Sequence, residues 1–329
     1  MCLGTPSGQN LNQGFSPGSI LTGSSLTGGF SNFFFLEATS IPILNSNHTS
    51  NNIFHGWITV KTEATWIKCE NAKLYGEIHI PDAVPAPSIL ICHGMNKQGF
   101  HLLNMYDRLA RTACENGFVV LLFDFRGVGK SEGKFDYGVK EQSDVKCALN
   151  YLASRSDVTA NRIYVVGHSL GGAVSLYALQ NETRVKGLVL WSVPKNHDYN
   201  VRKFIRNKRG RRGLYRFLIL SRIDKLFNVS KLFKLEVYGI DLRPSYVRDK
   251  LMKLNECEAA SKLKEIPLLV VNGENDKIVG VDEAQEVYNS ANDPKSLLIL
   301  KSTDHIFKGK EDELVQKTMA WIENLDSQR

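Results

Sequence analysis

The 329-residue chain lacks any run of the roughly 18 consecutive apolar residues that a membrane-spanning helix requires. Its longest apolar segments, such as Phe118–Phe123 and Pro267–Val271, have the length of buried strands. With 43% hydrophobic and 23% charged residues, the composition is that of a globular protein with a sizeable core. It excludes a chain that is disordered throughout.

Cysteine is scarce and dispersed. The six cysteines stand at positions 2, 69, 92, 114, 147 and 257, and no two of them form a C-x-x-C pair. This spacing argues against a zinc knuckle or a dithiol redox site, and we expect no metal site. Cys92 and Cys147 lie in apolar patterns, where a free thiol packs as a small hydrophobic group. We therefore expect a reducing, cytoplasmic location, with peripheral membrane association as the alternative.

Basic residues are absent from the start of the chain. Residues 1–60 contain no lysine or arginine, and half of them are Ser, Gly, Asn or Thr. No positively charged segment precedes the short apolar patch Phe33–Leu36, which argues against a secretory signal peptide. We predict that residues 1–53 form a flexible low-complexity segment ahead of the folded protein.

Beyond residue 53 the apolar pattern alternates between strands and helices. His55–Lys61 and Leu74–Ile80 alternate as expected of an antiparallel strand pair. Further strands are predicted at 88–92, 118–123, 162–166, 185–191, 267–272 and 296–300. Helices are predicted at 102–116, 141–154, 170–180, 282–290 and 311–325. This order predicts an α/β fold, with a mostly parallel twisted sheet covered by helices on both faces.

The alternation stops at Pro194 and resumes at Pro267. We predict a core in two parts, residues 54–194 and 263–329, with an inserted helical cap at residues 195–262. The net charge of +7 gathers in this insertion, because residues 195–234 hold 13 Lys and Arg but only two acids. That segment carries +11, which leaves −4 for the rest of the chain.

Gly167-His168-Ser169-Leu170-Gly171 fits the pattern G-x-S-x-G between a predicted strand and a predicted helix. A serine on so sharp a turn has a strained backbone, whose close neighbours must be glycine. The turn presents the hydroxyl above the sheet, and the helix N-terminus favours a developing oxyanion. The pattern indicates Ser169 as a nucleophile, with Gly167, His168 and Gly171 in support.

A serine nucleophile needs a base, and the base needs an orienting acid. Asp276 and His305 each stand just beyond a predicted strand, where the carboxyl ends of parallel strands meet. The chain order Ser, Asp, His is that of an α/β-hydrolase. We predict Asp276 as the acid and His305 as the base, and expect their neighbours Glu274 and Asp304 to be solvated or supporting.

His93-Gly94-Met95 follows another predicted strand. Gly94 lets the next backbone N–H point into the site, so we predict the amides of Met95 and Leu170 as the oxyanion pair. His93 is expected to brace this loop by hydrogen bonds rather than to act as a base.

Together these motifs carry a family resemblance, extended by Asp124–Gly133, which reads DFRGVGKSEG. The stretch from Leu74 to Leu325 resembles the α/β-hydrolase superfamily. It is most similar to the cinnamoyl (feruloyl) esterase-like, serine-aminopeptidase-like and monoacylglycerol lipase-like branch. The resemblance implies the same nucleophile, acid, base and oxyanion donors. Met95 departs from the aromatic residue often found there, and Val128 departs from a histidine.

The resulting hypothesis is a serine carboxylic-ester hydrolase that acts on a small-molecule ester and needs no metal or organic cofactor. An acyl thioesterase or a lysophospholipase-type hydrolase would use the same residues. An aminopeptidase would need acidic groups in the cap for the substrate amine, and the cap is basic. A catalytically silent hydrolase-fold binding protein is the alternative from another class.

The cap contains a basic amphipathic helix. Its apolar residues recur at helical spacing with Arg216, Arg222 and Lys225 between them, and they are Leu214, Phe217, Leu218, Ile223, Leu226 and Phe227. The first interpretation is that this apolar side rests on the core. The others are docking on an anionic lipid surface and recognition of a phosphate-bearing substrate. Nucleic-acid binding is not expected, because no binding module accompanies the charges.

Overall fold

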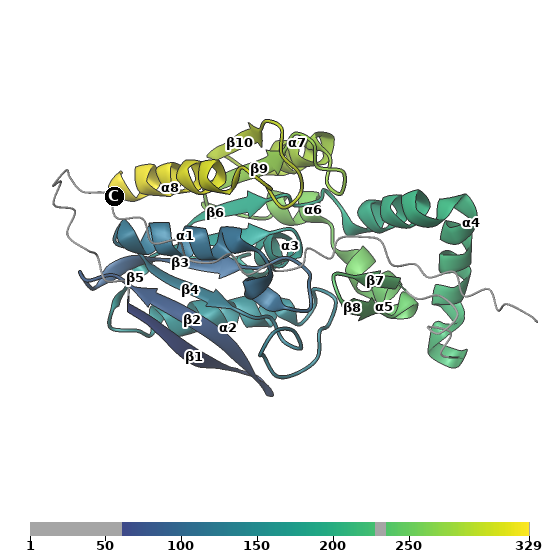
Figure 1. Cartoon of the computed structure of the whole chain (residues 1–329), viewed down its shortest axis with the longest axis horizontal. Helices are drawn as coiled ribbons and strands as arrows, with labels where there is room; N and C mark the ends of the chain where they lie inside the picture. The colour runs from purple at the N-terminus through teal and green to yellow at the C-terminus, as the bar shows by residue number, and fades with distance from the viewer. Residues whose placement is uncertain (1–60, 228–234, 329) are drawn as a thin grey trace, which may run out of the picture. The chain divides into compact units, whose positions relative to one another are not determined.

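The computed structural model of the chain describes residues 61–227 and 235–328, and the predicted segment 1–53 lies outside them. An eight-stranded sheet lies between layers of helices (Figure 1). The strands of both sheets are β1 Lys61–Cys69, β2 Ala72–Ile80, β3 Ala86–Cys92, β4 Val119–Phe123, β5 Val158–His168, β6 Val185–Trp191, β7 Leu235–Val237, β8 Ile240–Leu242, β9 Leu268–Gly273 and β10 Lys295–Leu300. The α-helices are α1 Asn104–Glu115, α2 Glu141–Ala153, α3 Leu170–Ala178, α4 His197–Phe227, α5 Pro244–Asp249, α6 Glu256–Ser261, α7 Val281–Ser290 and α8 Glu311–Ser327. Short 3₁₀ turns are η1 Gly99–Leu102 and η3 Leu251–Lys253.

The large sheet has the strand order β1-β2-β4-β3-β5-β6-β9-β10. Strand β2 is antiparallel to both of its neighbours, and every neighbouring pair from β4 to β10 is parallel. The predicted α/β class with a mostly parallel sheet is confirmed. Because parallel strands run in one direction, the residues that follow β3, β5, β9 and β10 meet at one edge of the sheet.

Both faces of the sheet are buried, which explains the unbroken apolar runs of its strands. In β3, Ile89 and Ile91 pack with residues of α1 and α8. The alternate side chains Leu90 and Cys92 pack with residues of α2 and α3 on the opposite face. Successive side chains of such a strand therefore pack into two separate cores, one on each face of the sheet, and neither set faces solvent.

The first hairpin differs from the prediction. The strand that pairs with β2 is β1, Lys61–Cys69, and the two are joined by a two-residue turn in which Glu70 has a φ of 52°. The predicted strand at residues 55–61 lies outside the described residues except for Lys61. The sequence pattern missed β1 because its apolar alternation is weak. Most of its side chains are exposed or half-buried, and only Ile67 and Cys69 are buried.

Between β6 and β9 the chain leaves the large sheet (Figure 1). The segment predicted as a helical cap holds α4, α5, α6 and also a two-stranded antiparallel sheet of β7 and β8, so it is not wholly helical. Helix α4 changes direction at Gly210, whose φ of 67° and ψ of −177° are not helical. Residues 197–209 and 211–227 therefore form two arms. No helix in the described part of the chain is long and apolar enough to cross a membrane.

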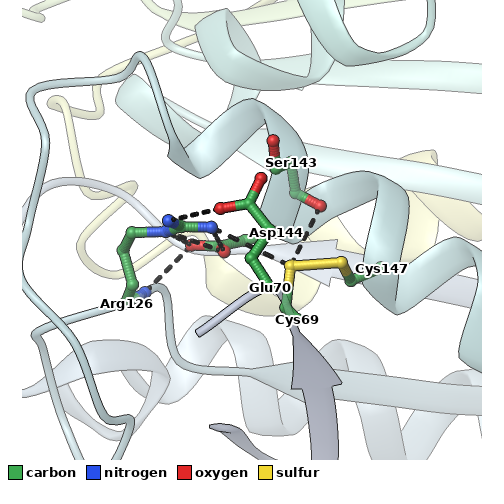
Figure 2. The surroundings of a disulfide bond; sticks show 6 residues. All are labelled: Cys69, Glu70, Arg126, Ser143, Asp144 and Cys147. Atoms are coloured by element: carbon green, nitrogen blue, oxygen red, sulfur yellow. Dashed lines mark hydrogen bonds and ion pairs between the residues drawn. A yellow bond between two sulfur atoms is a disulfide. The ribbon is translucent and has the colours of Figure 1, made fainter. Parts of the chain in front are cut away.

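A disulfide joins the end of β1 to α2 (Figure 2). Cys69 and Cys147 have their Cα atoms 5.6 Å apart, although 78 residues separate them along the chain. The prediction of a free thiol at Cys147 was wrong, whereas Cys92 is free and buried as expected. Because disulfides persist in oxidising compartments, this pair argues against the reducing environment inferred from cysteine spacing. The cytoplasmic location stays a prediction.

Arg126, in the loop after β4, lies beside this disulfide and is only 5% exposed (Figure 2). Its guanidinium donates to Asp144 of α2 at 2.9 Å from Nε and 2.6 Å from Nη2, and to Glu70 at 3.1 Å from Nη1. Nη2 also lies 3.8 Å from the Cys69 sulfur. The hydrogen bond from Arg126 lowers the pKa of the Glu70 carboxyl. The disulfide, the loop and α2 thus form one cross-linked cluster.

We expect the variant Cys69→Ser/Cys147→Ser to lose about 2–4 kcal/mol of unfolding free energy, because the closed loop no longer restricts the unfolded chain. Urea unfolding without reductant measures this loss. Dithiothreitol should destabilise the wild type by a similar amount and leave the double variant unchanged. In a Cys257→Ser control, which removes a free, half-buried thiol, the effect of dithiothreitol should persist. Rapid alkylation of Cys69 and Cys147 in the folded, unreduced protein would contradict the pairing.

Candidate active site

Ser169 is the single residue that connects β5 to α3, and it has a backbone conformation that non-glycine residues rarely adopt. Its φ is 51° and its ψ is −119°, and its N–H donates to the Trp191 carbonyl at 2.8 Å. Such a conformation costs about 1–3 kcal/mol and persists only where the surroundings enforce it. Gly167 and His168 are the last residues of β5, so the strand delivers the serine directly onto the turn.

Gly171 allows the close approach that holds this turn. A Cβ atom at Gly171 would lie 2.3 Å from the Cys92 carbonyl oxygen and 2.4 Å from that of His93. Helix α3 is thus pressed against the end of β3 at a distance that any side chain would prevent. This contact explains why the last glycine of G-x-S-x-G is required here.

The structure brings Ser169, His305 and Asp276 together at one edge of the sheet. His305 Nε2 lies 3.2 Å from Ser169 Oγ, although 136 residues separate them. His305 Nδ1 lies 2.8 Å from Asp276 Oδ2. Asp276 follows β9, His305 follows β10, and each is only 7% exposed. The serine is half-buried and the other two side chains are largely shielded from water.

The surroundings of Asp276 determine where the protons lie. Its Oδ1 accepts hydrogen bonds from the backbone N–H groups of Ile278 at 2.8 Å and Val279 at 2.9 Å. Burial by itself would raise the pKa of this carboxyl, but the hydrogen bond and charge of His305 and the two amides lower it overall. Asp276 is therefore a carboxylate that accepts the Nδ1 proton of His305. Nε2 is then free to accept the proton of the Ser169 hydroxyl.

The peptide between Gly94 and Met95 is held from both sides. The Gly94 carbonyl lies 2.7 Å from His93 Nδ1 and accepts from Asn96 Nδ2 at 3.0 Å. The Phe125 N–H donates to His93 Nε2 at 3.1 Å, so the His93 proton is on Nδ1 and points to Gly94. In a planar trans peptide the next N–H points opposite to the carbonyl. His93 and Asn96 therefore set the direction of the Met95 N–H.

Leu170 supplies the other predicted oxyanion amide. It is the first residue of α3, and the first N–H groups of a helix have no partner within the helix. Gly94 lies close to the same turn, because a Cβ atom there would be 3.4 Å from the Cβ of Ser169. Met95 and Leu170 are thus the chain neighbours of two residues that meet at this turn, Gly94 and Ser169, and their role as an oxyanion pair stays a prediction.

A chain of hydrogen bonds connects this loop to the backbone of His305. The Gly94 N–H donates to the Tyr106 hydroxyl at 3.0 Å, and that hydroxyl lies 2.7 Å from His168 Nδ1. His168 Nε2 lies 3.0 Å from the His305 carbonyl. The Gly94 N–H can only donate a hydrogen bond and the His305 carbonyl can only accept one. The direction of every hydrogen bond between them is therefore fixed. Tyr106 donates to Nδ1 of His168, and Nε2–H of His168 donates to His305.

Burial keeps the two supporting histidines neutral. It lowers the pKa of His93 to about 4. Burial, reinforced by the nearby charge of His305, lowers the pKa of His168 to about 3. Both therefore act as fixed hydrogen-bonding groups and not as bases near neutral pH.

Tyr106 and Asn96 were not predicted from the sequence. Asn96 is a neighbour of Met95, but nothing in the His-Gly motif signals its amide. Tyr106 belongs to the apolar face of α1 and looks like an ordinary core residue. Glu274 is exposed and accepts from the Ser302 N–H at 3.0 Å, in line with a supporting role. The described residues contain no cluster of three or more His, Cys, Asp or Glu arranged to hold a metal ion.

The segment predicted as the cap, residues 195–262, contacts the loop after β3. The Lys97 N–H, two residues beyond Met95, donates to the carbonyl of Tyr238 at 2.9 Å. Tyr238 lies in the turn between β7 and β8. The β7–β8 hairpin therefore lies against the candidate oxyanion loop.

Tyr106→Phe should slow the reaction of Ser169 with a fluorophosphonate, a reagent for nucleophilic serines, by about tenfold. The change removes the hydroxyl that accepts from Gly94 and donates to His168, and each buried group left unpaired costs about 1–3 kcal/mol. The rate constant of labelling measures the effect.

Tyr164→Phe is the matched control. Tyr164 is also fully buried, and its hydroxyl donates to Asp326 at 3.0 Å on another part of the molecule. Thermal melts of both variants separate lost stability from lost reactivity. If Tyr106→Phe labels no more slowly than Tyr164→Phe, the tyrosine does not position the site.

Comparisons with known proteins agree with this geometry. Residues 83–213 match the family described as "Serine aminopeptidase, S33". The uncharacterized protein YfhR of Escherichia coli K12 is 26% identical over 208 residues, which are 62% of this chain and 60% of that protein. The chain thus matches about three fifths of the length of this curated relative.

A relative with fuller coverage is the monoglyceride lipase homolog of monkeypox virus. It is 24% identical over 275 residues, covering 77% of this chain and 94% of that protein. Among solved structures, the Pyrococcus furiosus esterase PF2001 superposes with a TM-score of 0.60 at 21% identity, covering 87% of this chain and 99% of that one. The sheet order, the strand–serine–helix turn and the likeness to this solved structure show that the chain has the α/β-hydrolase fold.

Proposed function

We propose that this protein is a serine carboxylic-ester hydrolase that acts through an acyl-enzyme on Ser169. The observation that carries the proposal is the hydrogen-bonded series Ser169 Oγ, His305 Nε2, His305 Nδ1 and Asp276 Oδ2, at 3.2 Å and 2.8 Å. A serine hydroxyl is a weak nucleophile, and this series supplies both the base and the group that orients it.

In the proposed acylation step, Ser169 Oγ attacks the ester carbonyl while His305 Nε2 takes the hydroxyl proton. The carbonyl oxygen becomes an oxyanion, stabilised by the N–H groups of Met95 and Leu170. The C–O bond to the alcohol breaks, and His305 returns the proton to the leaving oxygen. Asp276 stays ionised and stabilises the imidazolium between these transfers.

Deacylation repeats the same steps with water. His305 takes a proton from a water molecule as it attacks the acyl-Ser169 carbonyl. The second tetrahedral intermediate collapses, the acid leaves, and His305 returns the proton to Ser169 Oγ. These residues complete the cycle without a cofactor.

The relatives favour an ester over other acyl compounds. The P. furiosus protein is an esterase, and the monkeypox relative is a monoglyceride lipase homolog. The matched family carries the name of an aminopeptidase. However, the first arm of the cap is rich in basic side chains, which disfavours a protonated amine in the substrate. A thioester or a lysophospholipid would follow the same two steps.

Ser169→Ala should reduce the hydrolysis of p-nitrophenyl esters by several orders of magnitude, toward the roughly 10⁶-fold loss known for removal of a serine nucleophile. Assays from acetate to palmitate measure this loss and give the preferred acyl length. Ser296→Ala is the matched control, because Ser296 is an exposed serine on β10.

Three outcomes would replace the proposal. Full activity of Ser169→Ala would exclude this nucleophile. Turnover of aminoacyl-p-nitroanilides but not of esters would indicate a peptidase. A folded wild type that hydrolyses none of these compounds, nor acyl-thioesters or lysophospholipids, would indicate a silent binding protein.

A further inference from the structure

The second arm of α4, residues 211–227, exposes large apolar side chains. Tyr215 is 66% exposed, Ile219 61% and Leu226 79%. At 3.6 residues per turn, positions i, i+4 and i+11 fall on one face, so these three form a ridge along the helix. Phe227, the last residue of the arm, is 72% exposed. The interpretation that the apolar side of this helix rests on the core is confirmed for Leu214, Phe217 and Leu218. It is wrong for Leu226 and Phe227.

The opposite face of the same arm is anchored, which fixes the ridge outward. Phe217, Ser221 and Asp224 are fully buried. Asp224 accepts from Arg243 Nε at 2.8 Å and from the Ser245 hydroxyl at 2.6 Å. The Ser221 carbonyl accepts from Arg248 Nη1 at 2.6 Å. An exposed apolar ridge on a helix that is anchored by its opposite face marks a surface for interaction.

Basic side chains border the ridge. Arg212 and Arg222 lie on its two sides, and both are exposed. Residues 206–227 hold eight Lys and Arg but a single acid, Asp224, which is buried against Arg243. The exposed side of the arm therefore combines aliphatic and aromatic groups with positive charge.

We propose that the face formed by Arg212, Tyr215, Ile219, Arg222 and Leu226 docks on an anionic lipid bilayer. In the interface, the apolar ridge would enter the boundary of the acyl chains while the arginines bind lipid phosphates. A second copy of this chain would bring arginines against arginines. The phosphates of a nucleic acid would pair with the arginines but would leave the apolar side chains of Ile219 and Leu226 in water. This inference rests on α4 and not on the proposed ester chemistry.

The test is co-sedimentation of the full chain with vesicles of phosphatidylcholine alone and of phosphatidylcholine with phosphatidylserine. We expect at least tenfold tighter binding to the anionic vesicles at low salt, and a decrease as salt is added. Ile219→Ser/Leu226→Ser and, separately, Arg212→Glu/Arg222→Glu should each weaken binding at least fivefold. Thermal melts and p-nitrophenyl ester hydrolysis in solution should stay unchanged in both, since all four side chains are exposed.

Trp66→Ser is the control, because Trp66 is a 52% exposed apolar residue on β1, outside α4. It should bind vesicles as the wild type does, and so should Ser169→Ala, which separates docking from hydrolysis. The proposal is overturned if the wild type does not bind anionic vesicles at low salt, or if the α4 variants bind like the wild type. Loss of self-association or of DNA binding in the α4 variants, without an effect on vesicles, would assign the face to those partners instead.

Discussion

The strained turn at Ser169 is the constraint on which the rest of the site depends. A residue with φ of 51° between a strand and a helix is stable only if its neighbours hold it there. Two contacts do so. The Ser169 N–H is bound to the adjacent strand β6, and Gly171 lets α3 press against the carbonyls at the end of β3. The same contact that strains the serine places the first N–H of α3 and the loop after β3 around its hydroxyl. The positions of the proposed nucleophile and of the proposed oxyanion donors therefore follow from one packing arrangement.

Three histidines meet near this turn, and their surroundings give them different chemistry. His93 and His168 are buried, neutral and hydrogen-bonded at both ring nitrogens. His305 instead faces the Asp276 carboxylate on one side and the Ser169 hydroxyl on the other. The hydrogen-bond directions at neutral His93 and His168 are fixed, because the backbone groups that end each series can only donate or only accept. Through Tyr106 and His168, the loop that aims the Met95 amide and the loop that carries His305 share one hydrogen-bonded network. The network thus positions the proposed oxyanion donor and the proposed base together.

Much of this arrangement follows from local sequence. Residues that end parallel strands must meet, so Ser169, Asp276 and His305 could be brought together from strand order and the G-x-S-x-G turn alone. The features that sequence missed are those set by tertiary contacts. Tyr106 reads as a core residue of α1, and only the fold brings its hydroxyl to His168. Cys69 and Cys147 lie 78 residues apart with no shared motif. Leu226 and Phe227 fit the apolar spacing of an inward helix face, but the kink at Gly210 and the anchoring of Asp224 turn them outward.

The central claim is that Ser169 carries the acyl group during turnover. The most direct measurement is acid quenching of the enzyme during the pre-steady-state reaction with p-nitrophenyl acetate, followed by peptide mass spectrometry. If Ser169 carries the acyl group, we expect a single acetyl group on the peptide that contains Ser169, formed in step with the release of p-nitrophenol. Rapid p-nitrophenol release with no acetyl group on Ser169, or with the group on another residue, would contradict it.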